Sequence, residues 1–223
     1  MNHDLLRDRP RNIRALFFDF DGVLVDSDPL WWAIIENVLN DLGLSTDTLT
    51  ARPSGLRLEE ALREASGACK ANTDLLALAA REVRKRAESI IPHQPLAPDA
   101  ARAIDVFYHA GIVMGIVSAS HTALLKKFIA LNRMSREIPI VVGGDRVTRT
   151  KPAPDGYRLA LREGKARPGE ACAVEDSDIG LLAAWRAGIW AVHFLRRDPR
   201  TESAGCPPHV TVRSVSELVS LIM

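Results

Sequence analysis

The pattern of apolar and polar residues predicts strands that alternate with helices over most of the chain. Short apolar runs are separated by stretches in which apolar residues recur every three or four positions. The apolar runs lie at 13–20, 112–117, 139–142, 171–174, 189–193 and 210–212. Repeated strand and helix units of this kind predict an α/β fold with a doubly wound parallel sheet, whose functional site lies at the carboxyl ends of the strands.

One long segment breaks this alternation. Between residues 29 and 91 apolar residues recur only at helical spacing, first at 30–42, then at about 58–65, and again after residue 73. Gly43 follows the first of these patterns, where a glycine is typical of a helix end. We therefore expect the segment to be entirely helical.

A proline-rich stretch separates this helical segment from the alternating part. Residues 92–98 have the sequence PHQPLAP, and three prolines in seven residues prevent a helix from continuing. We therefore predict an α/β core formed by residues 1–28 and 93–223, with an inserted helical cap domain at 29–92.

The first predicted strand ends in two acidic residues. Asp19 and Asp21 are separated by one position, so their side chains would point to the same side of an extended chain. Two carboxylates at this spacing repel each other unless a cation lies between them or one of them holds a proton. A hairpin turn at Asp21 and Gly22 is the alternative explanation of this pattern.

The next strands of the predicted sheet also end in polar side chains. Ser118 and Ser120 follow the second strand, Lys151 follows the third, and Glu175 and Asp176 follow the fourth. Each has an ordinary explanation: a helix N-cap for the serines, solvent exposure for the lysine, and a favourable helix dipole for the acids. Because parallel strands present their carboxyl ends at one edge of a sheet, we expect all these groups to meet in one site.

The composition excludes several classes of function. The 223 residues include 29 basic and 28 acidic side chains, and a net charge of +1 gives no basis for binding nucleic acid or an anionic membrane. The three cysteines are widely spaced, so we expect neither a disulfide framework nor a zinc site, and a reducing cytoplasmic location. Residues 1–10 are polar and no apolar run could span a bilayer, so we expect no signal peptide or membrane helix.

The groups at the strand ends fit the hydrolysis of a phosphomonoester. Asp19 would attack phosphorus and form an aspartyl-phosphate, while Asp21 would protonate the leaving oxygen and then activate water. Ser118 and the backbone amide of Ala119 would bind phosphate oxygens, and Lys151 would neutralise charge on Asp19 and on the phosphate.

The same chemistry requires a cation beside the phosphate. Mg²⁺ prefers oxygen ligands and would bridge the phosphate and the acidic side chains. The candidate ligands are Asp19, Asp21, Glu175 and Asp176, with Glu175 either binding the ion or supporting it.

These motifs strongly resemble those of the haloacid dehalogenase superfamily of phosphohydrolases. The matching residues are DFDGVLVDS at 19–27, then Ser118, Lys151 with Pro152, and Glu175 to Ser177, in an order and spacing that match across nearly the whole chain. The helical insert resembles the small cap of the branch that contains β-phosphoglucomutase, phosphoglycolate phosphatase and sugar-phosphate phosphatases. The resemblance implies that the cap opens and closes over the site and supplies specificity.

Two departures from the mutase pattern favour a phosphatase. β-Phosphoglucomutases carry a histidine where this chain has Trp31, and a phosphate-binding arginine in the cap where this chain has Leu58. The neighbouring Arg57 could replace that arginine, so a phosphosugar mutase stays the alternative. Trp31 and Arg57 are therefore candidate substrate-binding residues, together with Ser118, Ala119 and Lys151.

Two other classes fit less well. A signalling receiver carries its phosphorylated aspartate on a later strand and has no cap, and a silent phospholigand-binding protein would not need every reacting group. We therefore expect an enzyme that acts on a small phosphorylated metabolite, such as a sugar or sugar-acid phosphate, as a monomer or weak dimer.

Overall fold

A parallel six-stranded sheet forms the centre of the protein. The computed structural model describes residues 10, 12–44, 58, 62, 73–98, 100–195 and 210–223. The strands follow the order β3-β2-β1-β4-β5-β6, and every neighbouring pair is parallel. They are β1 (Ala15–Phe18), β2 (Val113–Val117), β3 (Ile140–Val142), β4 (Ala171–Glu175), β5 (Trp190–Phe194) and β6 (Val210–Val212). The predicted doubly wound α/β fold is thus confirmed.

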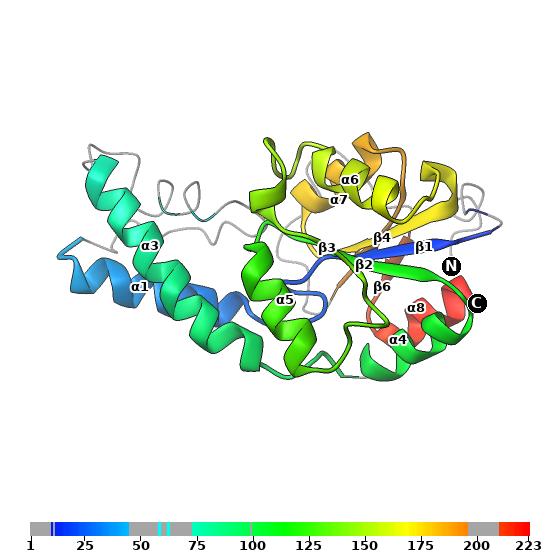
Figure 1. Cartoon of the computed structure of the whole chain (residues 1–223), viewed down its shortest axis with the longest axis horizontal. Coiled ribbons are helices and arrows are strands. Elements are labelled where there is room, and N and C mark those ends of the chain that lie inside the picture. The colour runs from blue at the N-terminus through cyan, green and yellow to red at the C-terminus, as the bar shows by residue number, and fades with distance from the viewer. Residues whose placement is uncertain are drawn as a thin grey trace.

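Helices cover both faces of this sheet. Residues of α4, α5 and α8 pack into the larger apolar cluster on one face, and residues of α6 and α7 pack into a second cluster on the other. In Figure 1 the sheet is seen between these two layers, and α1 and α3 project away from it. The helices are α1 (Asp28–Asp41), α3 (Thr73–Ile90), α4 (Ala100–His109), α5 (Thr122–Leu131), α6 (Asp155–Glu163), α7 (Asp178–Arg186) and α8 (Val215–Ile222), with short 3-10 turns at Ile91–His93, Gly144–Arg146 and Pro168–Glu170.

The central strand β1 is apolar throughout because both of its faces are covered. Leu16 and Phe18 belong to the larger cluster, whereas Ala15 and Phe17 belong to the smaller one. All four side chains are buried. An unbroken apolar run is therefore the sequence pattern of a central parallel strand.

The strand β1 is shorter than the predicted 13–20 because the chain turns at Phe20. The amide of Asp19 still donates to the carbonyl of Val174, but the amides of Leu24 and Val25 donate back to the carbonyl of Phe20. Gly22 takes a φ of +78° inside this turn. The turn releases the chain from the sheet immediately after the first acidic residue.

The described part of the segment 29–92 is helical, as predicted. It contains α1, α3 and the start of the 3-10 turn at Ile91–His93. Most of the helix predicted at 58–65 lies outside the described residues. Leu62, which is described, is buried in the larger cluster. The two ends of the insert meet where the amide of Ala97 donates to the carbonyl of Leu24 at 2.7 Å.

Among the residues that the structure describes, no helix combines the length and the apolar character needed to cross a membrane.

Candidate active site

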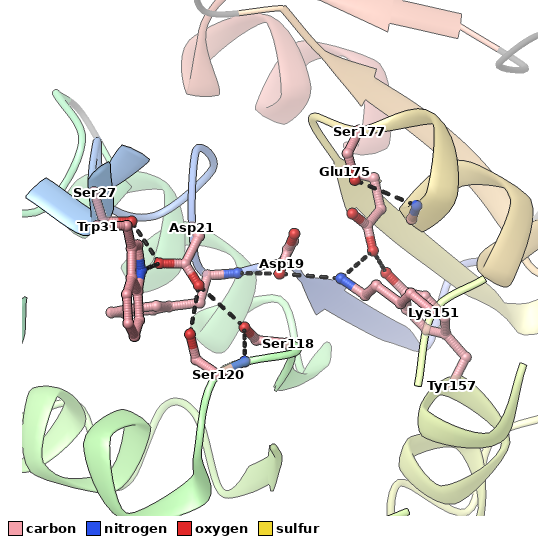
Figure 2. A network of polar contacts seen from close by, with 12 residues as sticks. Asp19, Asp21, Ser27, Trp31, Ser118, Ser120, Lys151, Tyr157, Glu175 and Ser177 are labelled. Carbon is pink, nitrogen blue, oxygen red and sulfur yellow. Dashed lines mark hydrogen bonds and ion pairs between the residues drawn. The ribbon is translucent and has the colours of Figure 1, made fainter. Parts of the chain in front are cut away.

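The polar groups at the strand ends come together at one edge of the sheet. The sheet order places β1 between β2 and β4, so residues that follow these three strands become neighbours. This position is the reversal point of a doubly wound sheet, where such folds form their sites. Figure 2 shows Asp19 between the side chains that follow β2 and those at the end of β4.

Asp19 is fixed at the centre of this group. The residue is 3% exposed, and its Oδ1 accepts a hydrogen bond from the amide of Phe20 at 2.7 Å. The same oxygen lies 3.0 Å from Nζ of Lys151. These contacts hold the carboxylate in one orientation, which is what a nucleophile requires.

Lys151 is buried between two carboxylates, so its alternative interpretation as a solvent-exposed lysine is wrong. Its Nζ lies 2.6 Å from Oε1 of Glu175 as well as close to Asp19. Burial alone would lower the pKa of Lys151, but the charges of Asp19 and Glu175 raise it above its usual value. The side chain is thus a permanent cation at neutral pH.

Tyr157 supports this ion pair, a role that the sequence did not reveal. Its side chain on α6 is fully buried, and its hydroxyl donates a hydrogen bond to Oε1 of Glu175. Nζ of Lys151 also lies 5.8 Å from the centre of the tyrosine ring. A tyrosine at an apolar helix position predicts only a core residue, so nothing in the pattern could have identified this contact.

The carboxylate of Asp21 accepts hydrogen bonds on both oxygens. Oδ1 accepts from Ser27 Oγ at 2.5 Å and from Trp31 Nε1 at 2.7 Å. Oδ2 accepts from Ser120 Oγ at 2.7 Å and from Ser118 Oγ at 3.3 Å. The donors come from the start of α1 and from the loop after β2, so two separate segments hold the carboxylate (Figure 2).

The surroundings of Asp21 favour a protonated carboxyl group. Burial and the nearby charge of Asp19 raise the pKa of Asp21, and the hydrogen bonds from Ser27, Ser120 and Trp31 only partly oppose this effect. A carboxyl group whose pKa is raised holds its proton more readily, which suits general acid catalysis.

The hydroxyls of the two serines after β2 contact Asp21 and do not cap a helix. The N-cap residue of α5 is His121, so the N-cap interpretation of Ser118 and Ser120 is wrong. Ser118 Oγ accepts a hydrogen bond from the amide of Ser120 at 3.0 Å. Ala119 lies between them and is half-buried. The hydrogen bonds of the two serines direct this short loop toward Asp21.

Three carboxylates form a group that fits a divalent cation. Asp19, Glu175 and Asp176 each place one oxygen within 4.8 Å of the others. No described residue donates a hydrogen bond to the buried Oε2 of Glu175 or Oδ1 of Asp176. Oxygens of this kind are the ligands that Mg²⁺ prefers, and a cation would satisfy both atoms.

The pKa values of Glu175 and Asp176 show that their negative charges are not balanced, as expected of a site for a cation. Burial first, and then the charge of Asp19, raises the pKa of Glu175 to about 8 and raises that of Asp176 well above its usual range. The carboxylate of Asp21 lies outside this group, because it is held by the serines and by Trp31.

Two glycines leave the space that these carboxylates occupy. A Cβ atom on Gly22 would lie 1.7 Å from Oδ2 of Asp176, and one on Gly180 would lie 1.9 Å from Oε2 of Glu175. Gly22 belongs to the first sequence motif, but Gly180 in α7 was not identified from the sequence. Both positions require glycine because the acidic side chains fill the space next to them.

The remaining candidates are only partly placed. Trp31 lies on α1, and its indole N–H is directed at Asp21. Arg57 lies outside the described residues. Leu58, where mutases carry the arginine, packs against the larger apolar cluster.

Comparison with known proteins identifies the family of the chain. The family of haloacid dehalogenase-like hydrolases matches residues 16–194. Hexitol phosphatase B from Escherichia coli (strain K12) is 25% identical over 214 residues, which are 95% of this chain and 96% of that protein. Fructose-1-phosphate phosphatase YqaB from the same strain is 28% identical over 185 residues, which are 80% of this chain and 94% of that protein.

A solved structure shows the same similarity in three dimensions. The crystal structure of CbbY from Rhodobacter sphaeroides in complex with phosphate superposes with a TM-score of 0.78 at 25% identity, over 92% of this chain and 96% of that chain. The family predicted from the sequence motifs is thus confirmed.

Proposed function

Because the chain belongs to the haloacid dehalogenase-like hydrolases, we propose that it is a Mg²⁺-dependent phosphatase that hydrolyses a small phosphorylated metabolite, such as a sugar or sugar-acid phosphate. The observation that carries this proposal is the buried Asp19 beside Lys151, with Asp21 held two residues further along. The names of two relatives, a hexitol phosphatase and a fructose-1-phosphate phosphatase, support the sugar phosphate class.

The first step uses Asp19 as the nucleophile. One of its carboxylate oxygens forms a bond to phosphorus while the bond from phosphorus to the leaving oxygen breaks, which gives an aspartyl-phosphate. Lys151 holds Asp19 at 3.0 Å and offsets the negative charge that gathers at the phosphoryl group. Ser118 and the amide of Ala119 would donate hydrogen bonds to the phosphoryl oxygens from the loop after β2.

Proton transfer falls to Asp21. Its carboxyl group gives a proton to the leaving oxygen, and the resulting carboxylate then takes a proton from the water that attacks the aspartyl-phosphate. Its raised pKa suits the first role, because the group must be protonated when the substrate binds. Free phosphate and the restored Asp19 are the products.

Asp19, Glu175 and Asp176 would hold the cation. When bound there, Mg²⁺ would offset the charge of the phosphoryl oxygens and of the carboxylates. Glu175 also contacts Lys151, so a bound ion would share the charge of this carboxylate with the lysine. The sequence also suggested Asp21 as a ligand, but the position of its carboxylate supports the role in proton transfer instead.

Mg²⁺ should stabilise the protein more at about pH 8 than at about pH 5. Without the ion, the raised pKa of Glu175 contributes stability that is fully present below the usual glutamate pKa of 4.5 and lost as the pH rises through about 8. The ion removes this loss, because it binds the ionised carboxylates. Thermal unfolding with and without Mg²⁺ at both pH values measures the effect, and a larger shift at the lower pH would contradict the proposed ligands.

Gly22→Ala should weaken Mg²⁺ binding by about 10- to 100-fold, because the new Cβ would displace Asp176. Gly43→Ala is the matched control, since Gly43 also has a positive φ, of +69°, but nothing lies within 4 Å of an added Cβ. Both variants should lose roughly 1 kcal/mol of stability through backbone strain. Titration calorimetry with Mg²⁺ separates them, and equal affinities would argue against Asp176 as a ligand.

We also propose that the enzyme acts in the reducing cytoplasm, without nucleic acid or membrane, as a monomer or weak dimer. The balanced charge supports the absence of polyanionic partners, and the wide spacing of the three cysteines supports a reducing location.

The decisive experiment measures phosphate release from a panel of sugar phosphates, phosphoglycolate and 6-phosphogluconate, with and without Mg²⁺. Isomerisation of β-glucose 1-phosphate is followed in parallel. Metal-dependent release from one or a few members is the expected result. Conversion to glucose 6-phosphate without comparable release would instead identify a mutase, and no turnover of any member would contradict the proposed substrate class.

A further inference from the structure

We propose that Trp31 is a positioning residue that fixes which oxygen of Asp21 carries the proton delivered to the leaving group. This inference rests on the proposed function, because it assigns a role within the same proton transfer. It also replaces the expectation that Trp31 serves mainly to bind substrate, since its indole N–H is directed at Asp21.

The start of α1 presents two hydrogen-bond donors to one oxygen of Asp21. The amide of Trp31 donates to the carbonyl of Ser27 at 2.9 Å, which is the bond of a first helical turn. This spacing places the side chains of Ser27 and Trp31 on the same side of the helix. They donate to Oδ1 of Asp21 at 2.5 and 2.7 Å (Figure 2).

The hydroxyl of Ser27 contacts Asp21 and does not cap the helix. Ser27 occupies the N-cap position of α1, where a serine normally accepts a hydrogen bond from the helix. Its side chain makes no such bond, and it is completely buried against Asp21. The helix therefore begins without a side-chain cap, and its first turn is arranged around the carboxylate.

The two oxygens of Asp21 differ in the chemistry of their donors. An indole N–H can only donate, so the oxygen facing Trp31 remains an acceptor whether or not the carboxyl group is protonated. Oδ2 instead faces the hydroxyls of Ser120 and Ser118, which can donate or accept. Trp31 therefore favours the proton on Oδ2, the oxygen on the side of the loop expected to bind phosphate.

Substrates with different leaving groups can test whether Trp31 affects delivery of the proton. A sugar alkoxide is a poor leaving group and needs the proton, whereas nitrophenolate leaves without it. The value of kcat/KM reports the steps up to formation of the aspartyl-phosphate, which include departure of the leaving group. The ratio of kcat/KM for p-nitrophenyl phosphate to that for a sugar phosphate therefore measures how well the proton is delivered.

Trp31→Phe removes the N–H and keeps an aromatic ring. We expect kcat/KM to fall by about 10- to 100-fold for the best sugar phosphate of the panel, as for loss of a hydrogen bond to a charged group, and to change little for p-nitrophenyl phosphate. Trp31→His, which keeps an N–H donor, should restore part of the loss. Trp32→Phe on the same helix is the matched control and should leave the ratio unchanged.

An equal loss of kcat/KM on both substrates after Trp31→Phe would overturn the inference, because a substrate contact or a packing role would act on both. If Trp31→Phe does not fold, benzothienylalanine at position 31 replaces only the N–H by sulfur and keeps the shape of the ring. The same substrate-dependent loss is expected with that analogue.

Asp21→Asn separates this inference from the function on which it rests. It should show the same dependence on the leaving group with a larger loss. If Asp21→Asn shows the dependence and Trp31→Phe does not, only the role of Trp31 is wrong. If Asp21→Asn shows no dependence, the proposed proton transfer is wrong as well.

Discussion

Replacing Asp19 with asparagine should lower kcat by at least about four orders of magnitude, because the amide cannot form the aspartyl-phosphate. The fold should persist, since an asparagine oxygen can still accept the hydrogen bonds from the amide of Phe20 and from Lys151. The metal-free variant should even unfold at a higher temperature, because one charge leaves a group of three neighbouring carboxylates. Phosphate release and thermal unfolding measure the two effects.

The matched control is Asp105→Asn, which makes the same change at an exposed position on α4. It should leave both turnover and stability unchanged. Turnover of the Asp19 variant within tenfold of wild type, with the fold intact, would show that another group attacks phosphorus.

Asp21→Asn should lower kcat for a sugar phosphate by about 10²- to 10⁴-fold, because asparagine cannot transfer a proton in either step. With an aryl phosphate the first step needs no proton, so the variant should release nitrophenolate in a rapid burst equal to the enzyme concentration. The aspartyl-phosphate then accumulates because no base activates the water. Stopped-flow absorbance measures the burst, and acid quenching with labelled phosphate detects the intermediate.

A steady rate without a burst, at the level of the wild-type enzyme, would show that Asp21 does not activate the water.

Ser120→Ala provides an intermediate case. It removes one donor to Oδ2 but leaves the carboxyl group in place, so its loss should be smaller than that of Asp21→Asn.

The sequence predicted which residues meet, because topology alone decides it. Once the strands were identified, the parallel order required Asp19, Ser118, Lys151 and Glu175 to lie at one edge, and the structure places them there. Helix ends were also predicted where a local signal exists, as at Gly43, which has a positive φ after α1.

The direction of each side chain could not be predicted in the same way. Asp19 and Asp21 were both candidate metal ligands, yet the turn at Phe20 directs Asp21 toward Ser27 and Trp31, away from the other three carboxylates. The turn depends on backbone hydrogen bonds and on the left-handed conformation of Gly22. The spacing of apolar residues along the chain contains no information about either.

Contacts that join distant segments were hidden for a related reason. Tyr157 looks like a core residue on its own helix, and only the packing of α6 against the sheet brings its hydroxyl to Glu175. The space that Gly180 leaves for the same side chain is likewise a property of the assembled fold.

The hydrogen bond between Ala97 and Leu24 holds together the two points at which the insert joins the core. The insert leaves the core and returns to it at adjacent points, so in energetic terms it is a closed loop. The entropic cost of closing such a loop grows only slowly with its length. Recombination that exchanges this segment for one of another size would leave the sheet and its acidic edge intact. The core could therefore accept inserts of other lengths as long as the first turn of α1 keeps the hydrogen bonds of Ser27 and Trp31 to Asp21, which makes that turn the point where an exchange would meet the chemistry.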